Sequence, residues 1–372
     1  MPVDPNLDRV RHRFQGERLL QARLARGMKK VDLARLIGVS PAAIGQYESS
    51  QTRPSQDVVG RLALAVGFPI SFFESTRPNA SLSEEKAHFR RLRSISSSAR
   101  SLQIARLALL EELVSRIEQD VELPNVDIPT VAVVGGTRSE IEVVAGEVRT
   151  QWNLGNGPIA NVVALLESKG CVLARLVSGS DGVDAYSRWS GYRPIVVLTR
   201  DKDDAARSNF DAAHELGHLV LHQDPQPGSR VLEEEAQAFA AAFLMPAEGI
   251  GNELPHRFDL PTFIALKRRW RVSVQALLFR SRVLGSISEA AYKRAMVKIS
   301  LWGWRAGEPD DIGEVEEPYL LSAAMELLIR ERGLDSMALA EELSLPIDLM
   351  NEFVPPPVDR LRLEAPSWGG RS

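Results

Sequence analysis

Three histidines spaced four residues apart carry the clearest chemistry in this sequence. His214, His218 and His222 stand in the stretch NFDAAHELGHLVLH, residues 209–222, and Glu215 directly follows the first. Residues four apart lie on one face of a helix, so two imidazoles can bind a single metal ion. The H-E-x-x-H spacing is typical of zinc peptidases, in which the glutamate takes a proton from water. It predicts His214 and His218 as Zn²⁺ ligands and Glu215 as general base.

The alternative is an amphipathic core helix that carries histidines for another reason. The remaining positions are apolar enough for a buried helix: Ala212, Ala213, Leu216, Leu219 and Val220. Buried imidazoles and a buried carboxylate without partners are unfavourable, and this favours the metal site. Gly217 costs about 1 kcal/mol relative to alanine in a helix, which indicates close packing or access to the metal. We expect His222 to support the site or the fold.

A third ligand has to come from another element, and the next predicted helix begins with three carboxylates. The stretch VLEEEAQAFAAAFLMP, residues 231–246, carries Glu233, Glu234 and Glu235 ahead of an apolar face. Helical spacing alone does not choose among them, although Glu233 lies three residues before Ala236, on the packed side. Manganese or iron can use the same ligand types as zinc, so the metal itself stays open.

Three β-rich runs precede this pair of helices. CVLARLV, VDAYSRW and RPIVVLT are separated by Gly, Ser and Asp, which are typical turn residues. We expect them to form a small antiparallel sheet beside the metal helix. An edge strand of such a sheet can hold a peptide backbone by strand addition, but the sequence does not identify the edge.

The N-terminal part predicts a different activity. Two apolar helical segments are separated by the turn GVS, and Ser40 followed by Pro41 is a good start for the second helix. The matches DLARLIGVS, IGQYE and RPS resemble the Xre, or lambda-repressor-like, DNA-binding family over about residues 16–75. This resemblance implies that the helix from Pro41 to Glu48 enters the major groove of operator DNA. The expected DNA-contacting residues are Lys30, Ser40, Pro41, Ala42, Gln46 and Arg53.

Direct base reading by this helix is expected to be modest. Of the exposed positions of this helix, only Gln46 carries a side chain suited to base edges, and Ser40 lies just before the start of the helix. Charge supports binding through phosphates, since residues 1–100 hold 17 Lys/Arg against 9 Asp/Glu and the remainder holds 28 against 40.

The central part resembles the ImmA/IrrE metallopeptidase family over most of residues 135–310. The resemblance is carried by FDAAHELGHLVLH followed by EEEAQAFAAAFLMP, against a family pattern of AHELGH and then E-x-x-A-N-x-F-A-x-x-L-M-P. It implies that His214, His218 and Glu233 bind the metal and that Glu215 is the general base. Gln237 replaces the asparagine of that pattern. A fusion of this kind implies a protein substrate, a repressor or antitoxin-type protein, cut to relieve repression.

The remaining segments give weaker indications. An apolar stripe over residues 104–117 fits a core helix, a dimer seam or a spacer, so a homodimer stays open. The linker around Ser94–Ser98 is a candidate for self-cleavage. Residues 320–353 read as helices for packing or protein contact, with an acidic surface that disfavours phosphates, and the Pro- and Gly-rich end is expected to be disordered. The polar N-terminus and the single cysteine, Cys171, suggest a cytoplasmic protein without membrane contact.

These observations predict a mainly α fold with a small α+β domain. The expected parts are a helix-turn-helix domain at 1–78, a helical linker at 79–129, a zincin-like domain with a short antiparallel sheet at 130–310, and a helical C-terminal region at 311–372. The expected function is a DNA-binding transcriptional regulator with a zinc-dependent endopeptidase domain. The alternative is a non-catalytic transcription factor whose metal domain is a sensor or interaction module, which would have no need of Glu215.

Overall fold

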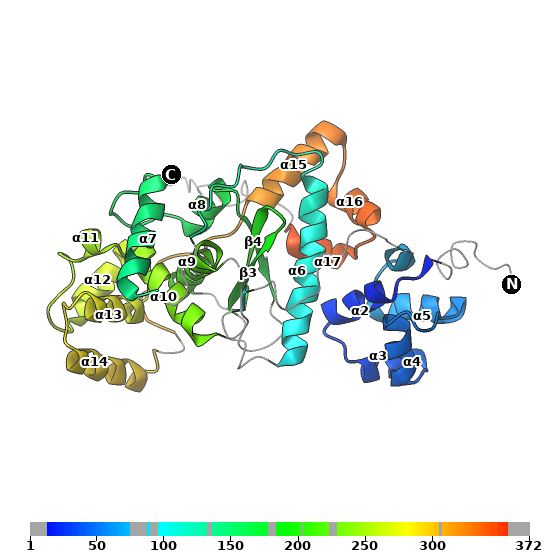
Figure 1. The fold of residues 1–372 in the computed structure, drawn as a ribbon, viewed down its shortest axis with the longest axis horizontal. Helices are drawn as coiled ribbons and strands as arrows, with labels where there is room; N and C mark the ends of the chain where they lie inside the picture. The colour runs from blue at the N-terminus through cyan, green and yellow to red at the C-terminus, as the bar shows by residue number, and fades with distance from the viewer. Residues whose placement is uncertain are drawn as a thin grey trace, which may run out of the picture.

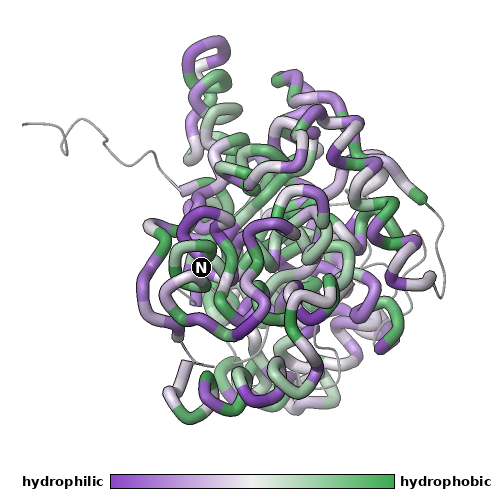
Figure 2. The backbone as a smooth tube through the Cα atoms, turned by 90° about the vertical axis from the view of Figure 1, so that its left-hand side faces the viewer, coloured by the Kyte–Doolittle hydropathy of each residue, from purple (hydrophilic) through white to green (hydrophobic). Residues whose placement is uncertain are grey.

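The computed structural model describes residues 13–74, 96–131, 136–177, 184–201, 204–222, 229–304 and 307–355, together with the backbone of His88 and Phe89. The N-terminal domain lies at one end of an elongated molecule, and the sheet lies near its middle (Figure 1). Along the helices, hydrophilic and hydrophobic stretches alternate, as in amphipathic helices (Figure 2). Among the helices of these ranges, none has the length and apolar character that crossing a bilayer requires.

Over residues 16–74, the N-terminal domain is a bundle of α-helices that ends in a 3₁₀ turn. Ser40 accepts a hydrogen bond from the Ala43 N–H at 3.1 Å, and Pro41 is the first helical residue, as predicted. The Gly16 backbone lies against the end of the helix that Pro41 begins, since a Cβ there would stand 2.1 Å from the Tyr47 carbonyl oxygen. The elements are α2 (Gly16–Ala25), α3 (Lys30–Ile37), α4 (Pro41–Glu48), α5 (Gln56–Val66) and η1 (Ile70–Glu74).

Helix α6 (Ser97–Ile117) stands between the N-terminal domain and the sheet (Figure 1). Its apolar stripe is buried within the single chain and belongs to one core with the N-terminal domain, one face of the sheet and the C-terminal helices. The stripe is therefore part of a core helix. The buried residues of the stripe are Ile104, Leu107, Leu110, Leu113, Val114 and Ile117.

The sheet has the strand order β1-β3-β4-β2. Its strands are β1 (His88–Phe89), β2 (Val172–Leu176), β3 (Ala185–Ser190) and β4 (Arg193–Thr199). The prediction of a wholly antiparallel sheet is wrong, because β2 pairs parallel with β4 while β1–β3 and β3–β4 are antiparallel. The cause is the tight turn at residues 191–192: it folds β3 and β4 into a hairpin, and β4 rather than β3 lies beside β2.

Alternate side chains of β3 bind different helices. Tyr186 donates a hydrogen bond to Gln103 of α6 at 3.0 Å, and Arg188 pairs with Glu111 of α6 at 2.9 Å. Ser187 and Trp189 point the other way, to the helix that carries the histidines. This is the two-residue period of a strand with both faces covered, and Figure 1 shows the sheet between the two helices.

The helices of the central domain cover the second face of the sheet and extend away from it. The histidine helix packs closely against the glutamate helix, because Gly217 would place a Cβ 3.2 Å from the Ala236 Cα. These helices are α7 (Arg138–Gln151), α8 (Val162–Ser168), α9 (Ala205–Leu221), α10 (Arg230–Leu244), α11 (Ala247–Ile250), α12 (Leu260–Trp270), α13 (Val274–Val283) and α14 (Glu289–Leu301).

The C-terminal region is helical and packs on the first core. It consists of α15 (Leu320–Arg332), α16 (Ser336–Leu343) and α17 (Ile347–Phe353). Its acidic residues bind arginines of other parts of the chain: Asp348 pairs with Arg26 at 2.5 Å, and Glu352 pairs with Arg106 at 2.9 Å. The predicted fold class, mainly α with a small sheet-containing domain, is confirmed. The segment predicted to be disordered lies outside the described residues from 356 onward.

Candidate metal centre

The structure brings together the three side chains predicted as metal ligands. The Nε2 atoms of His214 and His218 lie 3.1 Å apart, and each lies 3.5 Å from a carboxylate oxygen of Glu233. Within the described ranges, these three residues are the cluster whose donor atoms all fall within 4.8 Å of one another. Helix α9 supplies the imidazoles on one face, and the first turn of α10 supplies the carboxylate.

These distances fit a zinc ion. In a tetrahedral site with bonds of about 2.0–2.1 Å, neighbouring ligand atoms are separated by roughly 3.3–3.4 Å. The three measured separations, 3.1, 3.5 and 3.5 Å, lie around that value. The donor set of two imidazoles and one carboxylate is also one that zinc peptidases use.

Of the three neighbouring carboxylates at the start of α10, Glu233 is the one that faces His214 and His218. Glu234 lies on the surface and pairs with Arg230 at 2.7 Å. Glu235 is buried and accepts from the Nε2 of His222 at 2.9 Å. Glu233 itself keeps 27% of its side chain exposed, whereas the two histidines are almost fully buried. The cluster therefore opens to solvent on the side of Glu233.

A series of hydrogen bonds holds the ring nitrogen of His218 that faces away from the cluster. Its Nδ1 lies 2.9 Å from the Nδ1 of His222, and the Glu235 carboxylate holds His222 and accepts a second hydrogen bond, 2.8 Å long, from the Gly136 N–H. Burial lowers the pKa of His222 below its usual value, although the neighbouring Glu235 opposes the shift. His222 thus contacts a candidate ligand without joining the cluster, as the sequence led us to expect.

Ser187 is a site residue that sequence reasoning missed. Its hydroxyl donates a 2.7 Å hydrogen bond to the Oε2 of Glu215, and both residues are fully buried. This contact fixes the Glu215 carboxylate between α9 and β3. The available signal was a small polar residue between the bulky Tyr186 and Arg188 in a strand that is buried at this point.

The predicted DNA-contacting residues all lie exposed on the N-terminal domain. They are Lys30, Ser40, Pro41, Ala42, Gln46 and Arg53. Helix α4 presents its first turn outward, since Ile44 and Glu48 are its buried residues. Lys30 pairs with Glu48 at 3.3 Å and lies against α4 near Gly45, and Ser40 caps that helix. Lys30 and Ser40 therefore also stabilise α4.

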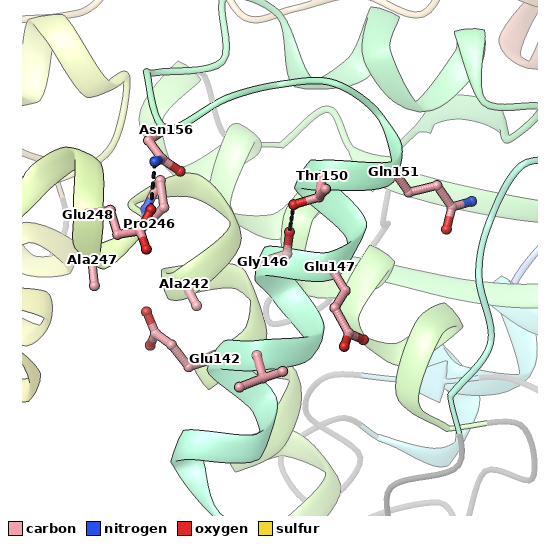
Figure 3. Close-up of a pocket in the computed structure, with 11 residues that line it drawn as sticks. Glu142, Gly146, Glu147, Thr150, Gln151, Asn156, Ala242, Pro246, Ala247 and Glu248 are labelled. Atoms are coloured by element: carbon pink, nitrogen blue, oxygen red, sulfur yellow. Dashed lines mark hydrogen bonds between the residues drawn. The ribbon is translucent and has the colours of Figure 1, made fainter.

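A separate hollow of about 600 Å³ lies on the outer side of α7, between this helix and α11 (Figure 3). Gly146 and Ala242 belong to its lining, and Asn156 donates a hydrogen bond to Glu248 across it at 2.8 Å. None of the three clustered residues of the candidate metal centre lines this hollow. The hollow is therefore distinct from the metal centre.

Comparison with known families identifies two domains. Residues 19–73 match the family model described as Helix-turn-helix, and residues 166–282 match the IrrE N-terminal-like domain. No curated protein matches the chain. The predicted fusion is confirmed: a helix-turn-helix domain of the DNA-binding, transcription-regulating type precedes a metallopeptidase-like domain that contains the histidine cluster and Ser187.

Proposed function

We propose that this chain is a DNA-binding transcriptional regulator with a working zinc endopeptidase, and that its substrate is a repressor or antitoxin-type protein. The observation that carries the catalytic part is the convergence of His214, His218 and Glu233 at zinc-ligand separations beside Glu215. A purely structural helix pair has no need of two buried imidazoles that face a carboxylate. A metal sensor, in turn, has no need of a buried glutamate held beside the ligands.

In the proposed hydrolysis, each side chain of the site has a distinct role. Zinc bound in such a site supplies an acidified water and polarises the scissile carbonyl. Glu215 takes the proton of the attacking water and passes it to the leaving amine. Ser187 donates a hydrogen bond to the Oε2 of Glu215 and so orients the carboxylate for this role.

His218 is positioned by its neighbours. With its Nε2 directed to the metal, its Nδ1 carries the hydrogen and donates to His222. The Nε2 hydrogen of His222 then points to Glu235, which matches the neutral ring that burial favours. Such outer partners fix the orientation of a ligand and raise its basicity.

The N-terminal domain supplies the DNA-binding part. We propose that Pro41, Ala42 and Gln46 of α4 approach base edges while Lys30 and Arg53 contact phosphates, with Ser40 at the helix start. With Gln46 as the main base reader, phosphate contacts dominate affinity, so binding falls steeply with salt. We also propose that the domains end at residues 78, 129 and 310.

A regulator works in the compartment that holds its DNA, so the proposed location is the cytoplasm.

The test combines bound metal with turnover. Bound zinc is measured by elemental mass spectrometry on the full chain, and hydrolysis is followed on fluorescent casein as a general polypeptide substrate. Wild type is expected to hold one zinc and to cut casein, and Glu215→Gln is expected to keep zinc and lose at least 99% of turnover. His214→Ala and Glu233→Ala are expected to lose both, with Glu234→Ala as the matched control that loses neither.

Two results would refute the proposal. If the protein binds no zinc even when zinc is added, His214, His218 and Glu233 are not metal ligands. Equal casein hydrolysis by wild type and Glu215→Gln assigns any activity to a contaminant. A zinc-loaded wild type without turnover, whose DNA affinity changes with zinc, would favour the sensor.

A further inference from the structure

The edge of β3 that does not pair with β4 is covered by another segment of the same chain. β1, which consists of His88 and Phe89, pairs antiparallel with β3, and its residues face Ser187 and Tyr186. This segment belongs to the stretch that joins the N-terminal domain, whose last described residue is Glu74, to α6 at Ser97. β4 covers the opposite edge of β3.

The same strand, β3, contacts the helix that carries the candidate histidine ligands. His88 is in register with Ser187, and the Ser187 hydroxyl is hydrogen-bonded to Glu215 at 2.7 Å. Two residues along β3, the Trp189 indole N–H donates to the Leu219 carbonyl of α9 at 3.4 Å. A polypeptide paired with the outer edge of β3 therefore runs beside the helix that carries the predicted base and two of the ligands.

We propose that the outer edge of β3 is the strand that binds the extended polypeptide substrate, and that His88 and Phe89 fill this edge in the resting chain as a tethered competitor. The inference rests on the proposed peptidase function. Because β4 occupies the other edge, a substrate that adds a strand to β3 has to displace β1.

The length of β1 makes such displacement feasible. A pair of residues forms few backbone hydrogen bonds with β3, and a hairpin-sized contact of this kind is only marginally stable by itself. Its advantage is that it belongs to the same chain, because a covalently joined competitor has an effective concentration on the order of millimolar. A good substrate is a longer extended segment that pairs with more of Ala185–Ser190 than the two residues of β1 do.

The test measures the binding of a free peptide with and without the tethered strand. The probe is a fluorescein-labelled peptide with the sequence of residues 82–95, LSEEKAHFRRLRSI. All proteins are full-length, zinc-loaded Glu215→Gln chains, so that binding is measured without cleavage. The test variant adds His88→Pro and Phe89→Pro, which remove both amide donors of β1. The matched control adds Ala80→Pro and Ser81→Pro in the same linker.

The expected result is a peptide Kd at least tenfold lower for the His88→Pro/Phe89→Pro chain than for its parent and for the control. Hydrogen exchange should show that the amides of Ala185–Ser190 lose protection in this variant and regain it when the peptide is added. Equal Kd values in all three proteins would overturn the inference. Absence of peptide binding in all three, or protection that appears outside β3, would also overturn it.

These outcomes are separable from failure of the proposed function. That function fails if zinc is not bound, or if Glu215→Gln leaves casein hydrolysis unchanged, and neither measurement involves residues 88–89. The inference fails if the zinc-loaded chains bind the peptide without regard to β1. The related prediction of self-cleavage around Ser94–Ser98 falls partly outside the described residues, while Ser97 and Ser98 form the first turn of α6.

Discussion

Replacing Gly217 with alanine should weaken the metal centre although alanine is the better helix former. Gly217 lies within α9 between the two candidate histidine ligands, where α9 packs against α10. An added Cβ would stand 3.1 Å from the Phe239 ring and 3.2 Å from both the Cα and the carbonyl oxygen of Ala236. Two of these three atoms belong to the backbone of α10, so the helix itself has to move by a few tenths of an ångström.

The magnitude follows from two opposing contributions. Alanine gains about 1 kcal/mol over glycine in a helix interior. Overpacking of a tight core contact costs about 1–3 kcal/mol, and backbone contacts place this site in the upper half of that range. The expected net loss is about 1–2 kcal/mol, which lowers the unfolding midpoint by roughly 2–8 °C for a domain of this size. Because Glu233 lies three residues before Ala236, the same movement of α10 also separates the carboxylate from the imidazoles.

Gly146→Ala supplies the matched control. Gly146 is inside α7 at the hollow in Figure 3, and a Cβ there would meet nothing within 4 Å. With propensity as the only contribution, this variant should raise the midpoint by a few degrees. Both variants are compared with wild type by thermal unfolding followed by circular dichroism and by zinc competition with a chelator. A Gly217→Ala chain that is as stable as Gly146→Ala and retains wild-type zinc affinity would refute the packing argument.

Three further predictions use other contacts. His222→Ala should reduce zinc affinity about 10–100-fold in chelator competition, because His218 loses the partner that orients its ring; unchanged affinity would remove His222 from the site. Glu112→Ala should destabilise the N-terminal domain by about 3–5 kcal/mol in urea unfolding, because it removes a 2.5 Å ion pair with the buried Arg18. The exposed Asp57→Ala is its control, with an expected loss below about 1 kcal/mol. Burial raises the pKa of the Cys171 thiol far above its usual value, so the native chain should not react with a thiol reagent until it unfolds.

Local spacing explains why part of the candidate site was predictable. His214, Glu215 and His218 are placed by one helix, and the period of that helix is a property of the backbone. The start of α4 was equally local, since Ser40 and Pro41 act on the turn that they begin. Glu233 could not be predicted from spacing alone. Three adjacent carboxylates point in three directions, and only the approach of α10 to α9 selects one. There the family resemblance supplied what spacing did not.

The remaining features depend on pairings between distant segments, which no local period encodes. The expectation of an antiparallel sheet missed the parallel pairing of β2 with β4, the strand that also forms a hairpin with β3. The stripe on α6 looked available for a dimer because its partners come from the N-terminal domain, the sheet and the C-terminal helices. Ser187 and His88 become relevant only once β3 lies across α9 and β1 pairs with β3. The candidate ligands His214 and His218 could thus be predicted from the spacing within one helix. Ser187, which contacts the predicted base, and β1, which covers the neighbouring strand edge, could be recognised only in the assembled sheet.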